Sequence, residues 1–104
     1  MNDQNLINEL FSALSKLKSQ EELSLFLRDL CTPQELKAMA DRWIVAQKVA
    51  NGVTYREISA QTGASTATVT RVARSLSLGE GGYRLLLNKL HHRHSFANDL
   101  EILD

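Results

Sequence analysis

Three helix-start signals of the same kind recur along the chain. Each is a serine or threonine followed three residues later by glutamate, a pair whose side chains satisfy free backbone N–H groups at a helix N-terminus. They begin at Ser19, Thr32 and Thr54. The second signal also has Pro33 at the first helical position, where a fixed φ angle and a missing N–H are tolerated. The signals predict that helices begin at these three places.

Residues that break helices are sparse. The 104 residues include five glycines and one proline, and 43% of them are hydrophobic, which is ordinary for a globular protein. Apolar residues recur at helical spacing between the few turn signals. We therefore predict an all-α fold of about six helices joined by short loops, over residues 3–17, 20–30, 33–50, 55–61, 66–76 and 83–91.

The apolar positions predict either a small core within one chain or a core shared by two copies of it. The third helix offers the buried candidates Leu36, Met39, Trp43, Ile44 and Val49. The first two helices each have an apolar stripe, and a chain of this length could hardly bury those stripes alone. We expect a small core or the shared core of a homodimer. The predicted organisation is a single domain over residues 1–92 and a C-terminal tail over residues 93–104 that is mobile or only weakly docked.

Several classes of protein are excluded by what the sequence lacks. It has no run of about 18 apolar residues and no N-terminal signal peptide, so we expect a cytoplasmic protein without membrane contact. No nucleophile lies in a recognisable catalytic motif, and there is no phosphate loop, so we do not expect an enzyme. The lone Cys31 has no evident catalytic partner.

The stretch from Thr54 to Leu76 has the features of a helix-turn-helix. Such a motif needs two short helices, a tight turn and apolar residues where the helices face each other. Gly63 lies at the turn, and the small Ser59 would let the second helix approach. The apolar residues on the facing sides are Ile58, Val69 and Val72.

The other side of the second helix suits the major groove of DNA. It offers short hydroxyls and one long cation, without an acid that would repel phosphate. Threonine is a mediocre helix former, so stability alone does not explain three threonines in one short helix. The alternative is a polar, solvated helix side. The DNA-facing candidates on this helix are Ser65, Thr66, Ala67, Thr70 and Arg71.

Arg56, on the first turn of the preceding helix, is a further candidate. It could contact a phosphate or reach a guanine edge, and it could equally be a solvated surface arginine. The net charge of the chain is zero. However, three arginines oppose a single glutamate between residues 54 and 78, so the positive charge gathers where the motif lies.

The span from Leu30 to Leu76 resembles the tryptophan repressor family. The segments that resemble it are 31–35, Arg42 and above all the run Gly63-Ala64-Ser65-Thr66-Ala67-Thr68-Val69-Thr70-Arg71. The resemblance implies an intertwined all-helical dimer that binds a pseudo-palindromic operator in double-stranded DNA. It also implies that the helix after Ser65 enters the major groove.

The resemblance further implies a pocket for L-tryptophan, lined by Thr32, Arg42, Thr68, Arg71 and Ser75. The family has glycine directly after the second arginine, and this chain has Val72, a branched side chain that is expected to obstruct the pocket. We therefore expect a regulator that needs no cofactor. The alternatives are a tryptophan-activated repressor and a protein-interaction module that does not bind DNA.

Two other side-chain groups allow a second interpretation. His91, His92 and His94 lie close enough to suggest a metal, but no cysteine or carboxylate cluster completes a site, so we expect a solvated helix end and no metal. Trp43 could stack on a base or a ligand. Its place on an apolar helix side favours the core or the dimer interface.

Overall fold

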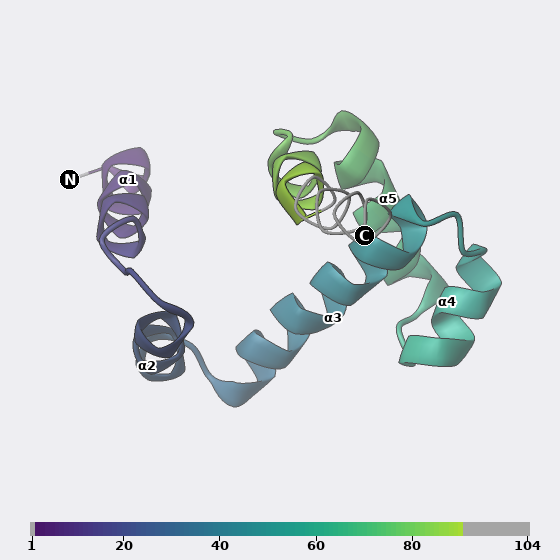
Figure 1. The fold of residues 1–104 in the computed structure, drawn as a ribbon, viewed down its shortest axis with the longest axis horizontal. Helices are drawn as coiled ribbons and strands as arrows, with labels where there is room; N and C mark the ends of the chain where they lie inside the picture. The colour runs from purple at the N-terminus through teal and green to yellow at the C-terminus, as the bar shows by residue number, and fades with distance from the viewer. Residues whose placement is uncertain (1, 91–104) are drawn as a thin grey trace, which may run out of the picture. The chain divides into compact units, whose positions relative to one another are not determined.

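The computed structural model of the chain describes residues 2–90, and within them it contains helices and no strand. The all-α fold with about six helices is confirmed. Residues 82–90 form the last helical segment. The labelled helices in Figure 1 are α1 (Asp3–Leu14), α2 (Gln20–Leu30), α3 (Pro33–Ala50), α4 (Tyr55–Thr62) and α5 (Thr66–Leu78).

All three predicted helix starts are present. The hydroxyls of Ser19 and Thr54 accept hydrogen bonds from the backbone N–H three residues on, at 3.1 and 3.2 Å. At the start of α3 the exchange is reciprocal, because Thr32 N–H donates to Glu35 Oε1 at 2.8 Å and Glu35 N–H donates to Thr32 Oγ1 at 3.1 Å. The bond from the Thr32 backbone, and then that from its side chain, hold the pKa of Glu35 below its usual value.

Two helix ends differ from the prediction by more than one residue. The first helix ends at Leu14 rather than Leu17. The carboxylate of Glu22 accepts from the backbone N–H of Lys18 at 2.8 Å, and this bond holds the chain before α2 in a loop. The second difference is that α5 ends at Leu78 rather than Leu76. Gly79, the next residue, is the first glycine after the start of α5 and favours the end of a helix.

The chain divides into two compact units, Met1–Ala38 and the part from Met39 onward, so the boundary falls within α3. In the first unit, α1 and α2 contain no buried residue. The second unit contains the hydrophobic core. No described helix is long and apolar enough to cross a membrane. The predicted single domain over residues 1–92 stays a prediction, and the tail and His91, His92 and His94 lie outside the described residues.

The core of the second unit joins three helices. Its buried residues are Val45 and Ala46 from α3, Ile58 from α4, and Val69 and Val72 from α5. Tyr83, in the segment 82–90, packs against this core and stacks on Trp43, with ring centroids 6.4 Å apart and planes 10° from parallel. Trp43 is thus half-buried at the edge of the core, in agreement with the core interpretation.

The predicted buried side of α3 was partly wrong. Met39 and Ile44 are 37% and 43% exposed, and the buried residues are Val45 and Ala46. Successive helical residues point about 100° apart, so α4 and α5 cover the side that bears Val45 and leave Ile44 outside. Helical spacing alone could not choose between the two, because both are apolar.

Candidate nucleic-acid interface

α4 and α5 pack against each other as the two helices of a helix-turn-helix. Gly63, the residue after α4, has φ +78°, a left-handed conformation that costs a residue with a Cβ about 1–2 kcal/mol. Its N–H donates to the Ser59 carbonyl at 2.9 Å. Thr62 Oγ1 then accepts from Ala64 N–H at 3.1 Å. These bonds set the direction in which the chain leaves α4 and enters α5.

One side of α5 is held by the core. Val69 and Val72 are 0% and 1% exposed, and Ala73 is 8% exposed. Ile58 of α4, fully buried, belongs to the same cluster. The inner side of α5 cannot rotate outward without exposing this apolar surface, so the residues on the opposite side face solvent.

The start of α5 is capped by Ser65. Its Oγ accepts from Thr68 N–H at 3.1 Å and lies 3.0 Å from Thr68 Oγ1, to which it donates. Both hydroxyls are therefore already hydrogen-bonded within the helix start. Ser65 is exposed and Thr68 half-buried, so of the two only Ser65 stands at the surface.

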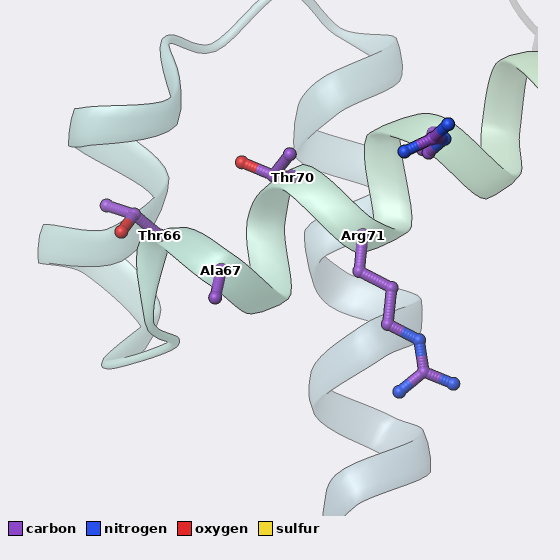
Figure 2. A pocket seen from close by; sticks show the side chains of 5 residues that line it. Thr66, Ala67, Thr70 and Arg71 are labelled. Carbon is purple, nitrogen blue, oxygen red and sulfur yellow. The ribbon is translucent and has the colours of Figure 1, made fainter.

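Along α5 the exposed side chains line one open concavity of about 490 Å³. Figure 2 shows four of them following one another on the helix, with the Arg71 guanidinium reaching away from it. The structure thus brings together four of the predicted DNA-facing residues and adds Arg74, which the sequence prediction missed. The outer face of α5 consists of Thr66, Ala67, Thr70, Arg71 and Arg74.

A signal for Arg74 was present in the sequence. It follows Arg71 by three residues, and residues three apart lie on the same side of a helix. The run on which the resemblance mainly rests ends at Arg71, and the spacing alone gave no reason to assign a role to Arg74. The structure supplies that reason, because Arg74 is exposed and lines the same concavity as the threonines.

The outer face is positive. α5 contains no acidic residue. Within residues 2–90 no carboxylate pairs with the guanidinium of Arg71 or Arg74. Two guanidinium groups beside short hydroxyls can bind phosphate oxygens and base edges at the same time.

Arg56 lies apart from the concavity. It is exposed on the first turn of α4 and is not one of the side chains that line the hollow of the outer face. Its environment agrees with a backbone contact made by the first helix of the motif, and equally with a solvated arginine. Both interpretations therefore stay open.

The residues expected to line a ligand pocket fall in two units. Thr32 lies in the first unit, where its hydroxyl and N–H are both engaged by Glu35. Arg42 and Thr68, in the second unit, are half-buried. Arg71 and Ser75 share a smaller open concavity of about 220 Å³, whose other lining residues are Arg74, Leu78 and Gly79.

Val72, which was expected to obstruct that pocket, belongs to the core. It is 1% exposed and clusters with Val45 and Ile58. A side chain so deeply buried makes close contacts on all sides. Its volume is therefore part of what holds α5 against α3 and α4.

Comparisons with known proteins agree on one family. A family model described as Trp repressor protein matches residues 5–91. A protein of Bacillus subtilis (strain 168), described as the uncharacterised protein YerC, is 40% identical over 84 residues, which are 81% of this chain and 81% of that protein.

Two solved structures are similar in sequence and in fold. A TrpR-like protein from Eubacterium eligens ATCC 27750 is 38% identical, with a TM-score of 0.79 over 84% of this chain and 90% of that chain. A proposed Trp repressor from Staphylococcus aureus is also 38% identical, with a TM-score of 0.78 over 88% of this chain and 95% of that one. Similarity of this extent covers the helix-turn-helix and the helices before it.

Proposed function

The chain belongs to the Trp repressor family, and from this membership we propose that it is a sequence-specific DNA-binding transcriptional regulator. It binds an operator and represses transcription there. The observation that supports the proposal most is the outer face of α5. It is exposed, free of acids and lined by hydroxyls and guanidinium groups, while the opposite side of the same helix is fixed in the core.

The proposed contacts divide by chemistry. Thr66, Ala67 and Thr70 meet base edges, because hydroxyls donate or accept there and methyl groups touch the thymine methyl. Arg71 binds at the edge of the groove, and Ser65 places the first turn of α5, with its free N–H groups, toward a phosphate. Arg56 is proposed as a backbone contact from α4.

We propose that the protein binds as a homodimer. In the single chain α1 and α2 bury no residue, and large apolar side chains on them are exposed, among them Leu6, Ile7, Phe11, Leu23 and Leu25. A second copy of the same chain would cover such a surface. A two-fold dimer would then place two recognition helices about 34 Å apart on a pseudo-palindromic operator.

The proposed regulator does not require L-tryptophan. Val72 fills the interior between α5 and α3, at the position where the family has glycine beside the ligand. Titration calorimetry with L-tryptophan should give no heat of binding for the natural chain. Micromolar binding would favour the alternative, a tryptophan-activated repressor, and a gain of binding by Val72→Gly would identify the valine as the obstruction.

DNA binding is tested by selecting duplexes from a random pool and then titrating salt in a gel-shift assay. The proposal predicts a pseudo-palindromic consensus, and binding to it should weaken steeply as salt rises because phosphate contacts release counterions. Thr70→Ala should lower the preference for the consensus over unrelated DNA. If no duplex is enriched at low salt, the protein is instead an interaction module built on the same fold.

A further inference from the structure

We infer that Arg74 is a phosphate-binding residue that clamps the sugar-phosphate backbone at the edge of the groove, together with Arg71. This inference rests on the proposed function and adds a residue to it. Arg74 follows the run 63–71 on which the resemblance mainly rests, and its assignment rests on its position in the fold. Three observations support the assignment: where the side chain lies, what surrounds it and how far it is from the base-reading residues.

Arg74 lies between two hollows on the surface of α5. Together with Arg71 it lines both the concavity of the outer face and the smaller one that continues toward Gly79. Its neighbours in sequence, Val72 and Ala73, are buried. The backbone at Arg74 is therefore held by the core, while the side chain is exposed and can reach a ligand on the outer face.

The distance along the helix separates Arg74 from the base readers. Eight residues separate it from Thr66, which is about 12 Å at 1.5 Å per residue. The major groove is itself about 12 Å wide. When the first turn of α5 lies over the base pairs, Arg74 is therefore at the groove wall, where the phosphates are. Thr70 is only about 6 Å along the helix and remains over the bases.

The surrounding charges favour an anion at this place. Arg71 and Arg74 are one helical turn apart, and within residues 2–90 neither guanidinium is paired with a carboxylate. Two unpaired cations so close together repel each other, and a phosphate between them would relieve that repulsion. A guanidinium can also bind phosphate through two parallel hydrogen bonds.

The first acidic residue after α5 is Glu80. This carboxylate lines the next concavity, with Ser75, Gly79, Gly82 and Tyr83, and not the two that Arg74 lines. It thus marks the side from which the DNA backbone is repelled. Removal of its charge should strengthen binding to any duplex, which is the opposite of the effect expected for Arg74.

The test measures binding of the full-length chain to the selected operator and to an unrelated duplex of equal length, across a range of salt concentrations. The variants are Arg74→Gln, Arg74→Lys and Glu80→Gln. The matched control is Arg28→Gln, which removes the same charge from an exposed arginine on α2. Thermal melting checks folding, and Arg74→Gln should melt like the natural protein because the Arg74 side chain is exposed.

Arg74→Gln should weaken binding to both duplexes by a similar factor, about tenfold. It should also lower the slope of log affinity against log salt by about 0.9 for each phosphate that is no longer neutralised, or about 1.8 for a dimer. Arg74→Lys should keep the slope, because a lysine still displaces a counterion. Glu80→Gln should strengthen binding to both duplexes.

Two results would overturn the inference while leaving the proposed function intact. One is an Arg74→Gln protein that binds like Arg28→Gln. The other is a loss confined to the operator with an unchanged salt slope, which would make Arg74 a base reader instead. Failure of the natural chain to bind any duplex would overturn the proposed function itself, so the two failures are distinguishable.

Discussion

At the scale of single residues, short polar side chains decide where helices begin, and a carboxylate that pairs with one of them makes stability depend on pH. Ser19, Thr32, Thr54 and Ser65 each accept from a backbone N–H three residues on. Of these four residues, only Thr32 makes both hydrogen bonds of a capping box, since the Thr32 N–H also donates to the carboxylate of Glu35. The sequence analysis identified Ser19, Thr32 and Thr54 because the contacts are local and independent of the rest of the fold.

The capping carboxylate gives the first prediction. The folded state lowers the pKa of Glu35, chiefly through the backbone N–H of Thr32. The stabilisation is therefore complete above the unfolded pKa of about 4.3 and is lost as pH falls through the lower folded value. The melting temperature of the natural chain should exceed that of Glu35→Gln at pH 7, and the difference should shrink below about pH 4.

The control for this prediction is Glu21→Gln, which removes a first-turn carboxylate from α2. At pH 7 the melting temperature of Glu21→Gln should differ less from that of the natural chain, because this substitution removes no hydrogen bond between a side chain and a capping residue. A gap between natural chain and Glu35→Gln that stays constant from pH 7 to pH 2 would contradict the assignment of the effect to the ionised carboxylate.

At the scale of elements, the turn between α4 and α5 fixes the direction of α5. Gly63 adopts φ +78°, and an added Cβ there would meet no other atom within 4 Å. The requirement for glycine is thus one of backbone conformation and not of space. The buried side of α5, formed by Val69 and Val72, holds the helix in the orientation that the turn allows.

Substitution at Gly63 gives the second prediction. Gly63→Ala should lower the free energy of unfolding by about 1–2 kcal/mol, because alanine pays the left-handed penalty. Gly63→Asn should cost less, since asparagine visits this conformation more readily. Chemical denaturation measures both changes. Equal losses for the two variants would show that the penalty is not conformational. The DNA affinity of each variant, measured well below its midpoint, tells whether α5 has changed direction.

At the scale of the whole molecule, the apolar surface exceeds what the single chain buries. The fully buried large side chains are confined to the second unit, whereas α1 and α2 have none. The dimer is the proposed reason for this surface. A dimer also doubles the number of DNA contacts that one regulator makes, so association and DNA affinity should change together.

The third prediction tests that association. Ile7→Glu places a charge on the apolar side of α1, where Ile7 is 43% exposed in the single chain. Analytical ultracentrifugation should find a monomer or a much weaker dimer, and the melting temperature should fall. Ser12→Glu, the same charge on the polar side of α1, should leave the dimer intact. A natural chain that sediments as a monomer at high concentration would contradict the proposed dimer.

The sequence by itself determined the fold class, the helix starts and the position of the helix after Ser65. Capping boxes, glycine turns and helical periodicity depend on neighbours within a few residues, so they can be recognised without coordinates. The resemblance to the repressor family rested on a similarly local run, residues 63–71, and the comparisons confirm it.

Only the tertiary structure decided which apolar and charged residues face the core and which face solvent. Val45 rather than Ile44 is buried, because α4 and α5 cover one side of α3. Arg74 belongs to the outer face because burial of Val72 and Ala73 turns it outward beside Arg71. Which side of a helix is buried depends on contacts between segments far apart in the chain. Where apolar residues lie on more than one side of a helix, helical spacing does not show which side those contacts will cover.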